Sequence, residues 1–233
     1  MKLYITKNIQ DEEVNLPDGL SRSSDVTLPN WIYKGPLVEL LKDGPSTFHK
    51  LIPLNYLNLY GAEPINPSGD IIFSHSFKRE SSSDVYNIIS KWLDTKHFDN
   101  SFSDLKSYLV MVISELVRNG IILNLQGDTY FAVELAVIES EDDVFITVKD
   151  FFGLLKNENI TSRLKDVAKS GNYEQKESGA GLGLFMVVNS VNSIHFEVVK
   201  KTTTLISCRI NKYKRLKQFK QKETALFFSE KDI

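Results

Sequence analysis

The sequence of 233 residues has a single cysteine, Cys208, which excludes an intramolecular disulfide framework and is usual for a reducing compartment. It also lacks any run of about 18 apolar residues, so it predicts no transmembrane helix. Its first residues lack the apolar core of a signal peptide. The net charge of −2 provides no overall field that would attract nucleic acid or an anionic membrane. We therefore expect a cytoplasmic protein that binds neither.

Proline is absent after residue 67, so all seven prolines fall within residues 1–69. Prolines at this density interrupt helices and central strands, and they predict an irregular extension or small subdomain with one short helix at 37–42. Residues 70–212 are expected to form the main domain, because their patterns are regular and the chain is long enough to bury a core. Residues 213–233 begin with a run of Lys and Arg. We interpret them as a solvated C-terminal tail rather than a nucleic-acid or membrane site.

Strand and helix periodicities alternate within residues 70–212. Apolar alternation predicts strands at 71–77, 130–138, 144–149, 194–199 and 203–210, with a polar hairpin turn at 139–143. Capping serines predict one helix that ends at about residue 93 and a long one from 104 to about 125. A third helix, to about residue 190, follows a glycine-rich segment.

The long predicted helix carries two residues that can do chemistry, Glu115 and Asn119. They are four positions apart and therefore share a face of the helix. A carboxylate and an amide in this arrangement can activate a hydroxyl and hold a magnesium ion. The alternative is that both belong to the wet side of an amphipathic helix.

A third candidate, Asp150, directly follows the predicted strand 144–149 and precedes Gly153 by three positions. A carboxylate at a strand end can accept a hydrogen bond from an exocyclic amine such as that of adenine. The alternative is a turn residue, because Asp is common in turns that follow strands.

Three glycines, Gly179, Gly181 and Gly183, stand just before an apolar helix. Glycine lets backbone N–H groups approach oxygen atoms closely, and the start of a helix favours an anion, so this segment is a candidate phosphate cradle. It matches neither the dinucleotide fingerprint nor the P-loop. The alternative is a flexible loop that leads into a packed helix.

In this order the three segments resemble the N, G1 and G2 boxes of the GHKL superfamily of ATPases. The resemblance implies an α/β (α+β) two-layer sandwich, with helices on one face of a mixed, mostly antiparallel sheet: the histidine kinase-like ATPase fold. It implies ATP and Mg²⁺ as ligands, beneath a lid formed by residues 154–178. The implied roles are a general base, Glu115; a magnesium ligand, Asn119; adenine contacts, Asp150, Gly153 and, through water, Thr203; and phosphate contacts, Gly179, Gly181, Leu182 and Gly183.

The compact order of elements is similar to the branch of anti-sigma-factor serine/threonine kinases. That branch implies a homodimer and a protein partner: a sigma factor, an anti-anti-sigma factor or another regulator. The sequence departs from the family pattern at G1, where Phe152 and Leu154 replace glycines, and after the N box, where Leu123 replaces a frequent histidine. Nucleotide binding is expected to tolerate these changes, whereas phosphoryl transfer depends on tighter positioning.

Three functions are therefore open. The first is a protein serine/threonine kinase or ATPase, the second is a catalytically weak nucleotide-sensing module that grips a protein partner, and the third is an adaptor without nucleotide. A sensor histidine kinase is disfavoured, because none of the four histidines fits a phosphoacceptor position in a dimerising helical hairpin. They are His49, His75, His97 and His195. These histidines and the lone cysteine also lack the spacing of a metal site.

Overall fold

The computed structural model describes residues 31–36, 65–99, 101, 103–124, 131–156, 159–160, 182–213 and 223–231. The helices are α2 (Ser82–Asp94), α3 (Leu105–Asn124) and α5 (Leu182–Ser190). The strands are β1 (Trp31–Pro36), β2 (Asp70–Phe77), β3 (Val133–Glu139), β4 (Asp143–Asp150), β5 (Ser193–Val199), β6 (Thr203–Asn211) and β7 (Glu223–Lys231). None of these helices is long and apolar enough to cross a membrane.

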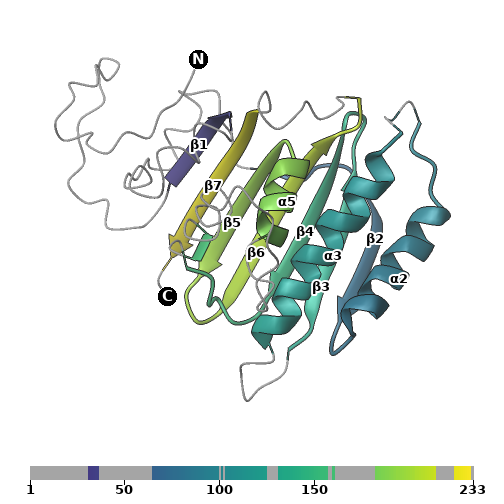
Figure 1. Cartoon of the computed structure of the whole chain (residues 1–233). Helices are drawn as coiled ribbons and strands as arrows, with labels where there is room; N and C mark the ends of the chain where they lie inside the picture. Colours follow the sequence, from purple (N-terminus) through teal and green to yellow (C-terminus); the bar gives the residue numbers. More distant parts are fainter. Residues whose placement is uncertain are drawn as a thin grey trace, which may run out of the picture.

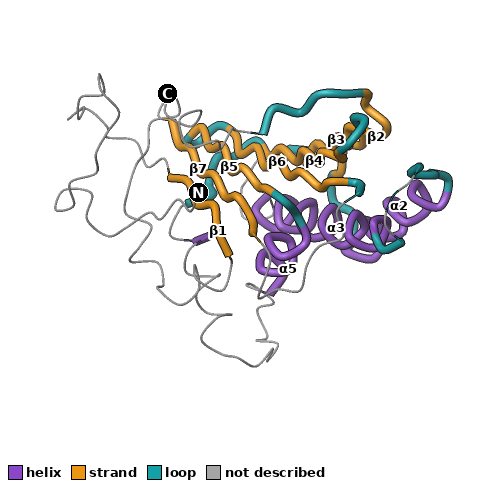
Figure 2. Tube along the Cα trace, turned by 90° about the horizontal axis from the view of Figure 1, so that it is seen from above, coloured by secondary structure: helices purple, strands orange, loops and turns teal. Residues whose placement is uncertain are grey.

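The seven strands form one sheet in the order β1-β7-β5-β6-β4-β3-β2. Neighbouring strands run antiparallel, except that β5 and β7 run parallel. Helices α2, α3 and α5 all lie on one face of this sheet (Figures 1 and 2). This is the two-layer α/β sandwich, with a mixed and mostly antiparallel sheet, that the sequence predicts.

Helix α2 forms where the sequence predicts it, because Ser81 caps its first turn. The Ser81 hydroxyl accepts a hydrogen bond from the backbone N–H of Asp84, and the Asp84 carboxylate accepts one from the N–H of Ser81, both at 3.2 Å. Trp92 in the last turn stacks on Phe73 of β2, with ring centroids 4.5 Å apart. The cap and this stack hold α2 over the β2 edge of the sheet.

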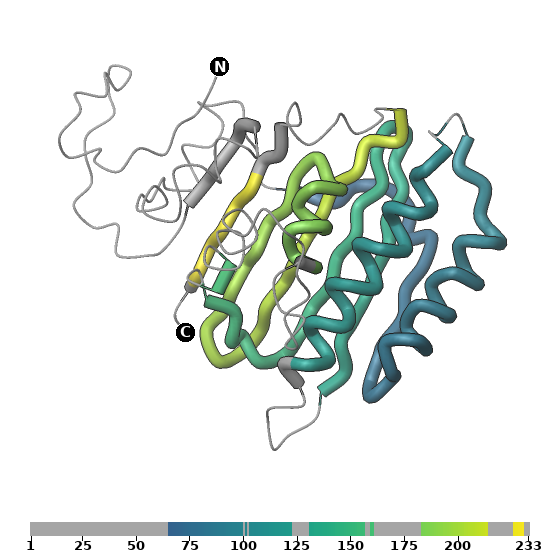
Figure 3. Tube along the Cα trace, viewed as in Figure 1, coloured from purple at the N-terminus to yellow at the C-terminus, as the bar shows by residue number. Residues whose placement is uncertain are grey.

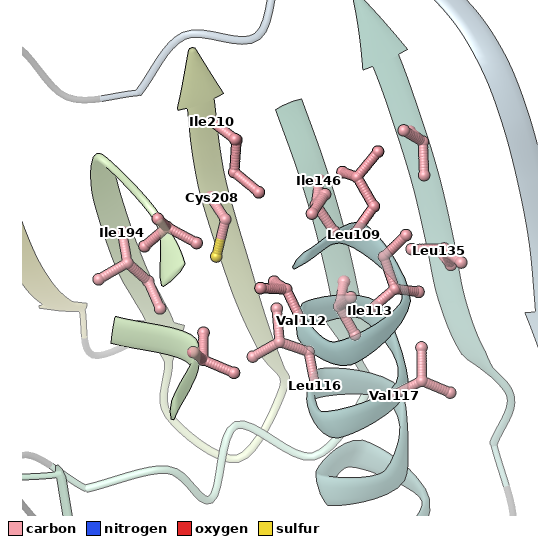
Figure 4. Packing of buried hydrophobic residues seen from close by; sticks show 14 of the residues in the cluster. Leu109, Val112, Ile113, Leu116, Val117, Leu135, Ile146, Ile194, Cys208 and Ile210 are labelled. Atoms are coloured by element: carbon pink, nitrogen blue, oxygen red, sulfur yellow. The ribbon is translucent and has the colours of Figure 1, made fainter. Parts of the chain in front are cut away.

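Helix α3 packs on the middle of the sheet, between α2 and α5. Its sheet-facing side chains are buried against apolar side chains of β3, β4, β5 and β6 (Figure 4). Because successive side chains of a strand alternate between faces, the even-numbered residues of β4 and β6 point toward the helices. Cys208 is one of them and is fully buried in the core. The helix contributes Leu109, Val112, Ile113, Leu116 and Val117; the strands contribute Leu135, Ile146, Ile194 and Ile210.

Within residues 70–212 the predicted strands and helices are present, with small shifts at their ends. The polar turn predicted at 139–143 joins β3 to β4, and there the N–H of Ser140 donates to the carbonyl of Asp143 at 2.9 Å. The short helix predicted at 37–42 and most of the predicted lid, including residues 161–178, lie outside the described residues.

The sheet extends beyond the predicted domain at both ends of the sequence. Strand β1 comes from the expected N-terminal extension and β7 from the expected C-terminal tail, and the two pair with each other. The prediction of a solvated tail is therefore wrong for Glu223–Lys231, which pairs with β5 and buries three consecutive apolar residues. They are Leu226, Phe227 and Phe228. The expected boundaries at 70 and 212 do not mark the edges of the sheet.

We expect Leu226→Ala to lower the free energy of unfolding by about 2–5 kcal/mol, because a fully buried side chain is replaced by a cavity. Ile71→Ala is the matched control, since Ile71 is 66% exposed on the edge strand β2. Its loss should cost less than about 1 kcal/mol. Denaturant unfolding followed by circular dichroism measures both variants. Equal and small effects would show that β7 does not belong to the cooperative core.

Candidate functional site

The polar face of α3 holds Glu115 in a tight group with residues one turn farther along. Nη2 of Arg118 donates to both carboxylate oxygens, at 2.8 Å to Oε1 and 2.6 Å to Oε2. Nδ2 of Asn119 donates to Oε1 at 3.1 Å. The Glu115 side chain is only 15% exposed. Ion pairs at this spacing contribute only about 0.2–0.5 kcal/mol to helix stability.

The start of α5 lies directly against this carboxylate. A Cβ atom built on Gly183, the second residue of α5, would overlap the carboxyl group of Glu115, so glycine is needed for this approach. The first turn of a helix also offers backbone N–H groups that have no partner within the helix. The structure thus brings together two of the predicted segments, the acid–amide pair and the end of the glycine-rich segment.

Asp150 is buried at the end of β4, with 5% exposure. Its Oδ1 accepts hydrogen bonds from the N–H groups of Phe152 at 3.0 Å and Gly153 at 3.3 Å. The interpretation of Asp150 as a turn residue is therefore correct. Its side chain also lies on the helix-facing side of the sheet, because it continues the alternation of Ile146 and Val148. Both hydrogen bonds are accepted by Oδ1, so Oδ2 takes no part in the hydrogen bonds of the turn.

Thr204, rather than the predicted Thr203, is the strand neighbour of Asp150. The two residues pair in the β4–β6 ladder, so their side chains lie side by side on the helix-facing side. Thr204 is 1% exposed, and its Oγ1 has no hydrogen-bond partner among the described residues. Thr203 is partly exposed and lies on the opposite face. The sequence contains a signal that favours Thr204 over Thr203. The apolar residues Cys208 and Ile210 occupy even-numbered positions of this strand, which indicates that these positions face the core.

Helix α3 and strand β4 both end at the same end of the sandwich, the lower end in Figure 3. Gly120 of α3 packs against Val133, with 3.0 Å between a Cβ built on Gly120 and Cγ2 of Val133. Val133 begins β3 at the level where β4 ends with Asp150. Glu115 lies five residues before Gly120, or about 7.5 Å along the helix axis. The hydrogen bonds of the described residues do not link Asp150 to Glu115, so a single ligand that bridges them stays a prediction.

A cavity of about 710 Å³ opens beside Glu115. Helices α2, α3 and α5 all contribute to its wall, and its lining includes Lys106, Arg118, Gly183 and Met186. On α3 the lining residues lie mainly on the side away from the sheet. The cavity is therefore the open, outer approach to Glu115, whereas Asp150 lies deeper, at the sheet.

The G1 segment is fixed by contacts within the protein. Gly153 has a φ of +57°, a conformation that favours glycine, and a Cβ built on it would overlap the carbonyl oxygen of Val199. The N–H of Lys201 donates to the Gly153 carbonyl at 3.3 Å. This packing against the β5–β6 turn explains the glycine without a ligand. Phe152, at a family glycine position, packs edge-on against Phe131 with ring centroids 5.4 Å apart.

The remaining predicted phosphate contacts are only partly within the described chain. Gly179 and Gly181 lie outside the described residues, and only the backbone of Leu182, the first residue of α5, is described. Gly183 is therefore the one predicted phosphate contact whose surroundings are defined. Among the described residues, no group of three or more His, Cys, Asp or Glu side chains converges on a metal position.

These features define a class of protein: a two-layer α/β sandwich with an acid–amide pair on one helix, a second helix that starts against it, and a buried carboxylate at a strand end. No protein-family model matches the chain, and no curated protein matches it. Among solved structures, the chain is similar to one in the crystal structure of the SiaB–SiaC complex from Pseudomonas aeruginosa. The two share 14% sequence identity with a TM-score of 0.44, over 60% of this chain and 89% of that chain. A likeness of this size carries no argument about function.

We expect Gly183→Ala to push aside the Glu115 side chain and break its hydrogen bonds to Arg118 and Asn119. The free energy of unfolding should fall by about 1–2 kcal/mol. In a Glu115→Ala background the same change should be neutral or stabilising by up to about 1 kcal/mol, because alanine is the better helix former once the carboxylate is gone. Denaturant unfolding of the four proteins measures this cycle. The same effect in both backgrounds would contradict the contact.

Proposed function

We propose that the chain is an ATP-binding regulatory protein of the histidine kinase-like class, which binds Mg-ATP and phosphorylates a protein partner on serine or threonine. The observation that carries this proposal is the approach of Gly183 to Glu115, so close that a Cβ atom on Gly183 would overlap the carboxyl group in its present position. Phosphate groups bind well where the backbone N–H groups of a helix start are exposed beside a metal ligand.

The buried end of the site offers two groups that fit an adenine base. Oδ2 of Asp150 is suited to accept a hydrogen bond from the exocyclic amine, while Oδ1 is held by the turn. Oγ1 of Thr204 is buried without a partner among the described residues, and a water or a ring nitrogen beside Asp150 would satisfy it. Asp150 and Thr204 would therefore orient the base.

The outer end fits the phosphates, the metal and the phosphate acceptor. Because Nδ2 of Asn119 faces Glu115, its amide oxygen is turned away and is the atom that would hold Mg²⁺. Bound Mg²⁺ supplies charge neutralisation for the phosphates. Glu115 would accept the proton of a serine or threonine hydroxyl as that oxygen attacks the terminal phosphate.

We include a protein partner in the proposal because the motifs resemble those of the anti-sigma-factor kinases. A sigma factor, an anti-anti-sigma factor or another regulator would present the hydroxyl, and the chain would act as a homodimer. The partner would approach from the outer side of the helix layer, because the cavity beside Glu115 opens there.

A second function, a nucleotide-sensing module with little phosphoryl transfer, is favoured by the pairing of Glu115 with Arg118. Both carboxylate oxygens accept hydrogen bonds from the guanidinium, so a hydroxyl of the partner has to compete with Arg118 for Glu115. Phe152 and Leu154 add bulk where the family pattern has glycine. Such a module would still bind ATP and a protein partner.

Isothermal titration calorimetry of the full chain with ATP and Mg²⁺ should detect binding. Asp150→Asn should weaken it about tenfold, because an amide accepts a weaker hydrogen bond than a carboxylate. Asp143→Asn is the matched control at the other end of β4 and should leave the affinity unchanged. Wild-type protein that gives neither heat nor a thermal shift with ATP or ADP would refute both nucleotide functions and support an adaptor.

Glu115→Gln separates the kinase from the sensing module. If Glu115 is the general base, the variant should bind ATP at least as tightly as the wild type and transfer labelled phosphate about 10²–10⁴ times more slowly. Glu134→Gln is the matched control, because Glu134 is exposed on the opposite face of the sheet. Equal phosphate transfer and ATP turnover by wild type and Glu115→Gln would leave the sensing module as the function.

A further inference from the structure

We infer that Arg118 is the residue by which this site distinguishes a nucleoside triphosphate from a diphosphate. In the structure its guanidinium is held by Glu115. With a triphosphate bound, the guanidinium turns to the terminal phosphate and releases the carboxylate. This inference deepens the proposed function and rests on it.

The position of Arg118 suits this role. Its side chain is 35% exposed and lines the cavity of about 710 Å³ together with Glu115 and Gly183. One terminal nitrogen, Nη2, makes both hydrogen bonds to Glu115, and Nε is buried without a hydrogen-bond partner among the described residues. A guanidinium carries five N–H groups in a planar fork, so the carboxylate does not exhaust its capacity to donate.

The charges around Glu115 favour a movement of Arg118 toward an incoming phosphate. A phosphate that enters between α3 and α5 meets the Glu115 carboxylate, and two anions this close repel strongly in a shielded site. Arg118 is the cation in contact with that carboxylate. The other Lys or Arg that lines the cavity is Lys106, which lies twelve residues earlier on α3, about 18 Å along the axis.

The terminal phosphate competes with Glu115 for Nη2 of Arg118, and the other N–H groups of the guanidinium strengthen its side of the competition. A guanidinium binds a phosphate with the same fork geometry as a carboxylate, and it binds both more strongly than a neutral donor does. A phosphate can therefore replace Glu115 on Arg118 without loss of hydrogen bonds. A diphosphate lacks the outermost group, so Arg118 stays on Glu115 and the acid remains covered. Only the triphosphate state exposes Glu115 to a partner's hydroxyl.

Calorimetric titration of the full chain with Mg-ADP and a non-hydrolysable ATP analogue with Mg²⁺ tests the inference. Arg118→Ala should weaken binding of the ATP analogue about tenfold and change ADP binding less than about twofold, which corresponds to about 1.4 kcal/mol of lost selectivity. Arg118→Lys keeps the charge without the fork and should restore part of the preference. Lys106→Ala removes the same charge from the same helix and cavity and should leave the preference unchanged.

Glu115→Gln provides a second readout, because it removes the group that competes with the phosphate. It should tighten binding of the ATP analogue several-fold, and Arg118→Ala should abolish that gain. Thermal unfolding checks that each variant folds. If Arg118→Ala does not fold, Arg118→Gln, which removes the charge but keeps the length, should show the same loss of selectivity.

The outcomes separate this inference from the proposed function. Equal weakening of the ATP analogue and ADP by Arg118→Ala, or no change in either, overturns the role of Arg118 while nucleotide binding stands. Wild-type protein that binds neither nucleotide overturns the proposed function, and the role of Arg118 with it.

Discussion

The contact between the Glu115 carboxylate and the backbone of Gly183 is the constraint on which the rest of the candidate site depends. The sheet holds both helices in place, since α3 buries its sheet-facing residues and α5 buries Val187 and Val188 completely. With both helices held, the absence of a side chain at Gly183 sets how closely the first turn of α5 approaches the acid. A larger residue there would displace the Glu115 side chain from the start of α5.

Most of the fold between residues 70 and 212 could be predicted, because its strands alternate and α2 carries a clear N-cap at Ser81. Strand β7 could not, because Leu226, Phe227 and Phe228 are all buried and show no alternation. The basic run before them also favours a tail. Its partners β1 and β5 are distant in sequence, so the pairing is a tertiary effect that local patterns do not contain.

Within the candidate site, the sequence predicted which kinds of residue are present better than it predicted where their side chains point. The spacing of Glu115 and Asn119 predicted a shared helix face, and their hydrogen bond confirms it. Three adjacent threonines precede the core of β6, and the choice of Thr203 over Thr204 was a shift by one residue, which reverses the face of a strand. Arg118 directly precedes Asn119 in the sequence of α3. The hydrogen bonds from Arg118 to both oxygens of Glu115 depend on side-chain geometry, which the spacing of residues in the sequence does not determine.

The two ends of the candidate site differ in how they are held. At the sheet, Asp150 is tied into a turn, Gly153 is locked against the β5–β6 turn, and Phe152 packs on Phe131. These backbone and ring contacts leave little room for adjustment, so a base bound there would be held alike whatever the number of phosphates. At the outer end the hydrogen bonds of Glu115 are made by side chains of the same helix, which can exchange partners without a change in the backbone. Under the proposed function, a response to the terminal phosphate would therefore begin with the pair formed by Glu115 and Arg118.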